Sequence, residues 1–305
     1  SQEYAPAMWQ RALQLSRRAL TLRDQQEANP DVEVGYEPDH VVCTLDLLSG
    51  IADGVAEGAA VLVSADPDGT REVILKAITD LMSPGIRRSG FALIGDIPKS
   101  PNAVGHLLPI LPRIIQSAVT QLDPTMVQAY NMGACNNACW STGEMAMAFD
   151  MAQIGPHASV LVNAFQRVLS QTMVHRSLGE NAAISLGRFA LRCPESISQS
   201  FETLVTPWCG ALRRLRDGVE KEQAFGGLVR LVQLNPAGGV NGLIPMLHAI
   251  ASWQKVRDVS LHGNLLQLMQ GYETLVGPQK WTEVIQNLGP AATKKLGGFA
   301  QNVGA

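Results

Sequence analysis

Apolar side chains recur three and four residues apart along most of the chain, which is the spacing of one buried face of an α-helix. Clear examples are VGHLLPILPRIIQSAV at 104–119 and ASVLVNAFQRVLSQTM at 158–173. We find no stretch in which apolar and polar residues alternate convincingly, as they would in a half-buried strand. The pattern therefore predicts an all-α protein.

Proline and glycine interrupt this helical pattern at short intervals, as in DPDG at 66–69, SPG at 83–85 and GP at 277–278. Such residues favour turns and helix ends, so we expect helix pairs with short joints. The one long joint, at 25–40, holds five acidic residues and no lysine or arginine. It is interpreted either as a solvated loop or as an acidic contact for a basic ligand.

A small residue recurs with a similar surround in DLLSGIAD, GFALIGD, CWSTGE and ISLGR. With Ala52, Gly95, Gly143 and Gly187 as anchors, the spacings are 43, 48 and 44 residues, which is the period of HEAT-type helix pairs. We therefore predict one HEAT-repeat solenoid over residues 1–305, a superhelix of about six antiparallel helix pairs. The second helices are expected near 40–60, 86–98, 127–149, 177–192, 217–234 and 257–275.

Composition and charge indicate a folded protein whose first half is acidic. With 46% apolar and 17% charged residues, the chain has the composition of a folded protein. The net charge of −3 hides an asymmetry, because residues 1–150 carry a net charge of −8 and residues 151–305 a net charge of +5. The acidic first half argues against a nucleic-acid groove there and favours a basic partner.

Motifs for catalysis and for cofactors are missing from the sequence. It holds no G-x-S-x-G, phosphate-binding loop, H-E-x-x-H or dinucleotide fingerprint, and its six histidines do not cluster. Cys135 and Cys139 stand one helical turn apart, but no further ligand lies near them in sequence, so they are interpreted as reduced thiols. We expect no enzyme, no cofactor, no metal and no membrane-spanning segment.

Four carboxylates fall on one expected helical face. Positions six before, three before and one after each anchor share a side, because offsets of three and four residues do so on a helix. Asp53, Asp96 and Glu144 then occupy one register on successive second helices, with Asp46 beside them. Such carboxylates repel one another unless a cation lies opposite, which favours a basic ligand.

The same face carries amides and an aromatic ring. Asn137 and Asn181 share a register, and a primary amide can bond both the N–H and the C=O of an extended peptide. Trp140 lies between them in the column and could anchor an apolar side chain or stack under arginine. The alternatives are that Trp140 is a core residue, and that Asn136, one position off the column, braces the next repeat.

These motifs resemble, in matching order, repeats of the transportin family of importin-β-type nuclear import receptors. The resemblance is carried by ACNNACWSTGE, TLDLLSGIADG, GFALIGD, ENAAISLGR and PWCGALRRLRDGVEKEQAFGGL, and the chain looks like the C-terminal part of such a receptor. The family implies a HEAT superhelix whose second helices line a concave acidic cargo surface. When the cargo-binding positions of the family are matched residue by residue to this sequence, the resemblance implies a cargo-signal site. Its members are Asp46, Asp53, Asp96, Asn136, Asn137, Trp140, Glu144, Ser177, Asn181 and Ile184.

The resemblance also implies the partners. These are basic or hydrophobic nuclear localisation signals of the proline–tyrosine type, on cargo that is often RNA-binding or ribosomal, together with nucleoporins. It implies shuttling between cytoplasm and nucleus without direct contact to nucleic acid or membrane. The GTPase Ran binds this family mainly through N-terminal repeats, which we expect to be absent here. The alternative function is a HEAT-repeat scaffold for a stable multiprotein complex, with folded partners on ridges or edges.

Overall fold

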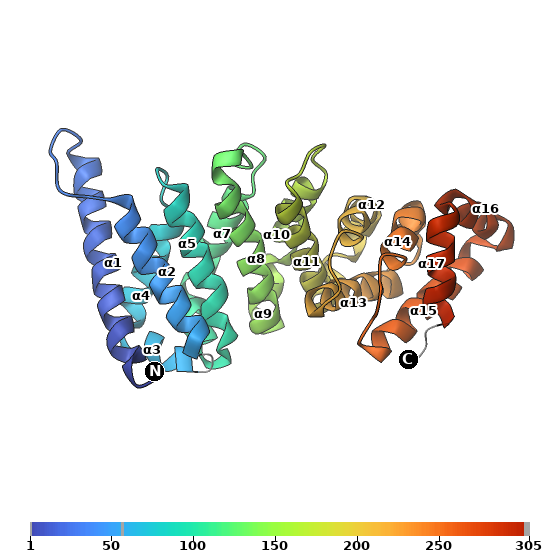
Figure 1. Cartoon of the computed structure of the whole chain (residues 1–305), viewed down its shortest axis with the longest axis horizontal. Helices are drawn as coiled ribbons and strands as arrows, with labels where there is room; N and C mark the ends of the chain where they lie inside the picture. The colour runs from blue at the N-terminus through green and yellow to red at the C-terminus, as the bar shows by residue number, and fades with distance from the viewer. Residues whose placement is uncertain (1, 56–57, 302–305) are drawn as a thin grey trace. The chain divides into compact units, whose positions relative to one another are not determined.

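The computed structural model describes residues 2–55 and 58–301 and divides the chain into two compact units, residues 1–154 and 155–305. All regular structure within the described ranges is helical, and these ranges contain no strand (Figure 1). The prediction of an all-α fold is therefore confirmed. Residues 56–57 of the helix predicted at 40–60, and residues 1 and 302–305 of the predicted array, lie outside the described residues.

Both units consist of α-helices joined by short turns, many of them single 3₁₀ turns. The α-helices of the first unit are α1 (Ala5–Ala28), α2 (Pro38–Val55), α3 (Ala59–Ala65), α4 (Pro67–Ile78), α5 (Pro84–Asp96), α6 (Val104–Leu107), α7 (Leu111–Gln121), α8 (Met132–Ala148) and α9 (Met151–Ile154). Those of the second unit are α10 (Ala158–Leu169), α11 (Arg176–Arg192), α12 (Phe201–Leu212), α13 (Val219–Leu234), α14 (Leu243–Ile250), α15 (Val259–Val276), α16 (Pro278–Leu288) and α17 (Pro290–Gln301).

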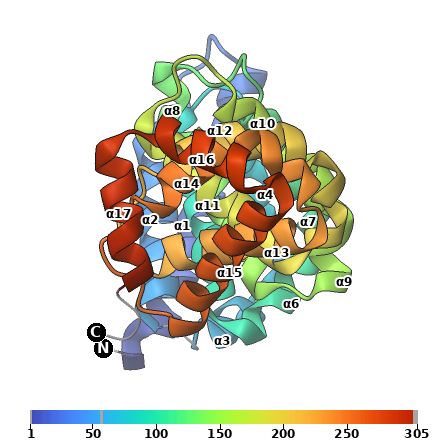
Figure 2. The same ribbon diagram turned by 90° about the vertical axis from the view of Figure 1, so that its right-hand side faces the viewer.

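Each unit is a stack of helix pairs. In the first unit, α1, α4 and α7 form one row and α2, α5 and α8 a second row, and each helix packs on its pair partner and on the next helix of its row (Figure 1). In the second unit, α10, α12 and α14 form one row and α11, α13 and α15 the other. Figure 2 brings α15, α16 and α17 to the front, where α16 packs on both of its neighbours in sequence. This is the packing of an α-helical repeat solenoid.

Proline and glycine mark the helix ends for identifiable reasons. Pro67 and Pro84 stand in the first turns of α4 and α5, where a missing N–H costs nothing. The preceding Asp66 and Ser83 cap these helices by accepting hydrogen bonds, and Asp66 Oδ1 lies 2.9 Å from the N–H nitrogen of Gly69. After α15, Gly277 adopts φ +82°, a left-handed conformation that ends the helix, and Pro278 starts α16 directly.

Small residues let α11 and α13 approach closely. A Cβ added at Gly187 would lie 2.3 Å from Ala224 Cα, and one added at Gly227 would lie 2.1 Å from the carbonyl oxygen of Gly187. Side chains at these positions would force the two helices apart. The anchor glycine of this repeat therefore serves helix-to-helix packing.

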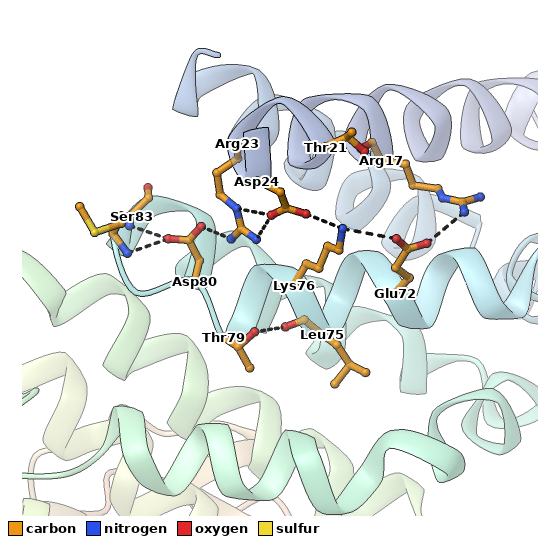
Figure 3. A network of polar contacts seen from close by, with 11 residues as sticks. Arg17, Thr21, Arg23, Asp24, Glu72, Leu75, Lys76, Thr79, Asp80 and Ser83 are labelled. Carbon is orange, nitrogen blue, oxygen red and sulfur yellow. Dashed lines mark hydrogen bonds and ion pairs between the residues drawn. The ribbon is translucent and has the colours of Figure 1, made fainter. Parts of the chain in front are cut away.

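A network of charges links α1 to α4 and to the α4–α5 joint (Figure 3). We call it the α1–α4 network; its charged members are Arg17, Arg23, Asp24, Glu72, Lys76 and Asp80. The Asp80 side chain is fully buried and lies 2.5 Å from Nη1 of Arg23 on α1. It also accepts hydrogen bonds from the N–H groups of Met82 and Ser83 in the α4–α5 joint. Arg23 contacts Asp24, which in turn binds Lys76 of α4 at 2.8 Å. Every buried charge of this set has an opposite charge beside it, as folding in a low-dielectric interior requires.

Four of the five thiols are buried, and Cys43 is exposed. Cys135 and Cys139 are buried on α8, and burial raises the pKa of both thiols above its ordinary value. In the described part of the chain, no three histidine, cysteine or acidic side chains gather as a metal site would require. No helix over those residues combines the length and apolar character needed to cross a membrane.

Candidate peptide-binding surface

Seven of the ten predicted site residues lie in the first unit, on helices that are packed side by side. We call this the α2–α5–α8 surface, because α5 packs against both α2 and α8. Its predicted members are Asp46 and Asp53 on α2, Asp96 at the end of α5, and Asn136, Asn137, Trp140 and Glu144 on α8. The remaining three, Ser177, Asn181 and Ile184, lie on α11 in the second unit.

Two of the predicted carboxylates meet through a lysine of the same chain. Lys99 Nζ lies 2.7 Å from Oδ1 of Asp53 and 2.8 Å from Oδ1 of Asp96. The second carboxylate oxygen of Asp96 accepts a short hydrogen bond from the hydroxyl of Ser49 on α2. The Asp96 side chain is 11% exposed and that of Asp53 is 59% exposed. The carboxylate of Asp96 is therefore held between α2 and α5, whereas that of Asp53 faces solvent.

Lys99 follows α5 in a single 3₁₀ turn, Ile97–Lys99. Burial lowers the pKa of its ammonium, but hydrogen bonds to Asp53 and Asp96 outweigh burial and raise that pKa above the ordinary value. Lys99 is therefore charged at neutral pH and is the cation that like-charged neighbours require. The helical register could not locate it, since Lys99 lies beyond the end of α5. The available signal was its position three residues after Asp96, a spacing that often pairs opposite charges.

Trp140 is half-buried and lies beside this lysine. A Cβ added at Gly95 would lie 2.2 Å from Cζ3 of Trp140, so the indole ring packs directly on the backbone of α5. Lys99 Nζ lies 5.4 Å from the centroid of the ring, within the range of a cation–π contact. The ring is thus only partly buried and already carries a cation.

A second cation, Arg88 of α5, lies beside the other end of the surface. Its Nη2 is 3.8 Å from Oδ2 of Asp46, and both side chains are about half exposed. Asn137 Nδ2 donates a hydrogen bond of 2.9 Å to the carbonyl oxygen of Arg88. One donor of Asn137 therefore braces the neighbouring helix, the role considered in the sequence for Asn136, which is half buried next to it.

The charges of this surface are more balanced than its carboxylate column suggests. Arg88 lies beside Asp46, and Lys99 lies between Asp53 and Asp96, so two positive charges offset part of the negative charge of the column. The groups concerned are Asp46, Asp53, Asp96, Glu144, Arg88 and Lys99. A half-buried aromatic ring, side-chain amides and carboxylates whose charge is only partly offset together can hold an extended basic segment.

The three predicted residues of the second unit differ in exposure. Ser177 Oγ lies 2.9 Å from Nδ1 of His175 at the start of α11. Asn181 is half buried, whereas Ile184 is only 6% exposed and belongs mainly to the core of its unit. Little of Ile184 is therefore accessible to a ligand in this conformation.

The second unit also has a groove that contains none of the predicted site residues. It lies between α13 and α15, has a volume of about 460 Å³, and is lined by apolar residues such as Val232, Leu268 and Leu275. The side-chain amides of Gln233 and Gln267 lie along it. The repeat columns of the sequence did not reach these helices.

Comparison with curated proteins gives long, continuous matches. No protein-family model matches the chain. The chain is 33% identical over 301 residues to transportin-1 of Oryza sativa subsp. japonica, and 28% identical over 278 residues to transportin-1 of Homo sapiens. It is 27% identical over 283 residues to importin subunit beta-2 of Schizosaccharomyces pombe. These matches cover 91 to 97% of the chain but only 30 to 32% of the relatives, so the chain spans about a third of their length.

Solved structures support the fold. A computationally designed armadillo repeat protein for modular peptide recognition matches 84% of the chain with a TM-score of 0.58 and 17% identity. A related designed armadillo repeat protein, solved in complex with the peptide (KR)4, matches with a TM-score of 0.55 and 17% identity. At this level of identity the likeness is one of fold, and it agrees with the helical repeat solenoid predicted from the sequence.

Proposed function

The chain is a homologue of the transportins, also named importin beta-2, over about a third of their length, and we propose that it is part of a nuclear import receptor. In this proposal it has no enzymatic activity and binds nuclear localisation signals of the proline–tyrosine type as extended peptides. It shuttles between cytoplasm and nucleus as part of the receptor. We keep the prediction of about six HEAT repeats over residues 1–305.

One observation carries the proposal: the half-buried ring of Trp140 bears the ammonium of Lys99, which two carboxylates bind. A basic side chain of a peptide finds there the opposite charge and the aromatic face that it prefers. The designed repeat protein with bound (KR)4 has the same fold, which supports the view that helix pairs of this kind can hold an extended basic peptide.

We assign the ten residues predicted from the sequence to the cargo-signal site. Asp46, Asp53, Asp96 and Glu144 attract basic side chains, and the ring of Trp140 takes a basic or an apolar one. The small exposed part of Ile184 contacts apolar side chains, and the amides hold the backbone. The proposed members are Asp46, Asp53, Asp96, Asn136, Asn137, Trp140, Glu144, Ser177, Asn181 and Ile184. A disordered signal loses conformational entropy on binding, so several anchors are needed to offset that cost.

The remaining partners are proposed on homology alone. Cargo proteins present the signal, and nucleoporins bind the receptor during passage through the pore. The GTPase Ran binds the complete receptor mainly outside the third that this chain spans. Nucleic acid and membranes are not direct ligands.

Replacing Trp140 by alanine tests the site. We expect Trp140→Ala to weaken binding of a basic proline–tyrosine-type peptide by about 2 kcal/mol, the typical loss for an aromatic anchor. Isothermal titration calorimetry measures the affinity. Trp281→Ala is the matched control, because Trp281 is a half-buried tryptophan on α16, away from the predicted residues. Equal affinities of wild type and Trp140→Ala would show that the α2–α5–α8 surface does not bind the peptide.

The alternative, a structural scaffold, makes a different prediction. A scaffold binds folded partners on its ridges or edges, so no short peptide should bind and substitutions at Trp140 should leave assembly intact. A pull-down with the same peptide, and with its charge-neutral counterpart, separates the two functions. Retention of folded partners without peptide binding would favour the scaffold.

A further inference from the structure

Lys99 already occupies the position on the α2–α5–α8 surface that a ligand's basic side chain would take. Its ammonium is hydrogen-bonded to Asp53 and Asp96 and lies over the ring of Trp140. These are the two kinds of contact, carboxylate and aromatic face, on which the proposed recognition of basic peptides rests. With Lys99 in place, neither contact is fully available to a second cation.

We propose that Lys99 is an intramolecular competitor for the cation position, and that an arginine of a bound peptide displaces it from Asp53, Asp96 and Trp140. The inference rests on the proposed function, since it deepens the account of how that site selects its ligand. Lys99 keeps the two carboxylates neutralised when no ligand is present, and it sets a threshold that weakly basic segments do not pass.

The geometry allows such an exchange. Lys99 is 37% exposed and lies in a short turn rather than inside α5, so its side chain can swing to solvent without disturbing the helix. Asp96 retains the hydrogen bond from Ser49 during the exchange and stays in position. Asp53 is the exposed partner and can adjust to the incoming group.

Arginine is the side chain best suited to displace a lysine here. The guanidinium has five N–H donors in one plane and can bond two carboxylates at once, and it stacks on an indole ring more readily than an ammonium does. A peptide lysine would merely replace one ammonium by another. Lys99 therefore confers a preference for arginine over lysine at this position.

The first test follows the Lys99 amine in the wild-type protein. Amine labelling with an N-hydroxysuccinimide ester, measured by mass spectrometry, reports whether Lys99 is hydrogen-bonded or free. An N-acetylated octa-arginine peptide is the probe, since it has neither lysine side chains nor a free α-amine to consume the reagent. We expect the peptide to raise the labelling rate of Lys99 several-fold, because a displaced ammonium loses the two hydrogen bonds that raise its pKa. An unchanged or lowered rate would overturn the proposal.

Lys76 is the internal control for this measurement. It is 32% exposed and hydrogen-bonded to Asp24 and paired with Glu72, so its environment matches that of Lys99, but it belongs to the α1–α4 network. We expect its labelling rate to stay constant when octa-arginine is added. Equal rises at both lysines would indicate a general loosening of the unit and would contradict the proposal.

The second test removes the competitor. We expect Lys99→Met and Lys99→Gln to bind octa-arginine roughly three- to tenfold more tightly than wild type at low salt, because two carboxylates and the ring are then open to the peptide. Lys99→Arg keeps a cation in place and should bind no more tightly than wild type. Lys76→Met controls for the change in net charge, and equal gains in Lys76→Met and Lys99→Met would overturn the proposal.

The proposed function and this inference can fail separately. If Trp140→Ala weakens the proline–tyrosine-type peptide while Lys99 labelling does not respond to octa-arginine, the function stands and the competitor role falls. If octa-arginine releases Lys99 but no proline–tyrosine-type peptide binds, the competitor role stands and the proposed function falls.

Discussion

Single residues on the α2–α5–α8 surface show how a column of carboxylates is held without strong repulsion. Asp53 and Asp96 share the ammonium of Lys99, and Asp46 lies near the guanidinium of Arg88. The carboxylates could be predicted from their spacing, because all lie on regular helices. The position of Lys99 could not be predicted, since its 3₁₀ turn leaves the helical register. The hydrogen bond of Asn137 could not be predicted either, because its acceptor is a backbone carbonyl of the neighbouring helix α5.

Asp217 links stability to pH in the second unit. Burial raises the pKa of its carboxyl, but hydrogen bonds from the N–H of Lys255, from Lys221 and from the N–H of Gln254 outweigh burial and lower that pKa. A carboxyl whose pKa is lowered by folding stabilises the native state above its unfolded pKa of about 3.9. The stabilisation is lost as the pH falls through the lower pKa of the folded state.

Asp217→Asn should therefore cost about 1–3 kcal/mol near neutral pH, the usual loss for hydrogen bonds to a charged group. The difference from wild type should shrink as the pH falls through the folded pKa of Asp217. Urea denaturation between pH 2.5 and 7 measures this. Glu283→Gln, on the exposed face of α16, is the control, and a constant difference at all pH values would contradict the account.

Asp80 and Arg23 form the most buried ion pair of the α1–α4 network. We expect Arg23→Met to destabilise the first unit by roughly 3–5 kcal/mol, because the fully buried Asp80 carboxylate would lose its counter-charge. Hydrogen exchange of α1 and α4 amides measures the local stability. Arg17→Met is the control, since Arg17 belongs to the same network but is half exposed.

At the scale of helices, the sequence predicts existence better than boundaries. The helix predicted near 86–98 spans Pro84–Asp96, because Pro84 starts it and Pro98 prevents its continuation. The helix predicted near 127–149 begins only at Met132, since residue 128 is extended and 129–131 form a 3₁₀ turn. Neither the end of α5 nor the start of α8 has a strong signal in the apolar pattern, because that pattern reports the buried face of a helix and not its ends.

The close approach of α11 and α13 gives a sharp test of packing. Gly227→Ala should destabilise the second unit by about 1–3 kcal/mol, because the added methyl group would overlap the carbonyl of Gly187. Gly226→Ala is a matched control one residue away, where the Cβ would meet only Leu191 at 3.4 Å. We expect that control to be neutral or stabilising, since alanine favours helix over glycine. Chemical denaturation of both variants decides the point, and equal stabilities would contradict it.

For the whole molecule, the distribution of charge matters most. The first unit carries a net charge of −8 and the second a net charge of +5. A basic peptide is therefore attracted to the first unit over distances of about 10 Å at moderate salt, which raises the rate of association more than the final affinity.

Asp53→Lys should slow the association of a peptide with a basic nuclear localisation signal and flatten the dependence of that rate on ionic strength. The substitution removes a negative charge at the proposed site and adds a positive one. Stopped-flow fluorescence at several salt concentrations measures the rate. Asp68→Lys changes the net charge equally, on a side chain of α4 that is 92% exposed and away from the surface. If both variants slow association to the same degree, net charge alone governs it.

The contact between Gly95 and Trp140 has a consequence for evolution. The indole ring occupies the space in which any side chain at position 95 would begin. A side chain at position 95 therefore requires the indole ring to move or to be lost, and the two positions should vary as a pair among descendants of a common ancestor. Sequences that keep the ring in this position should keep the glycine, whatever ligand they bind.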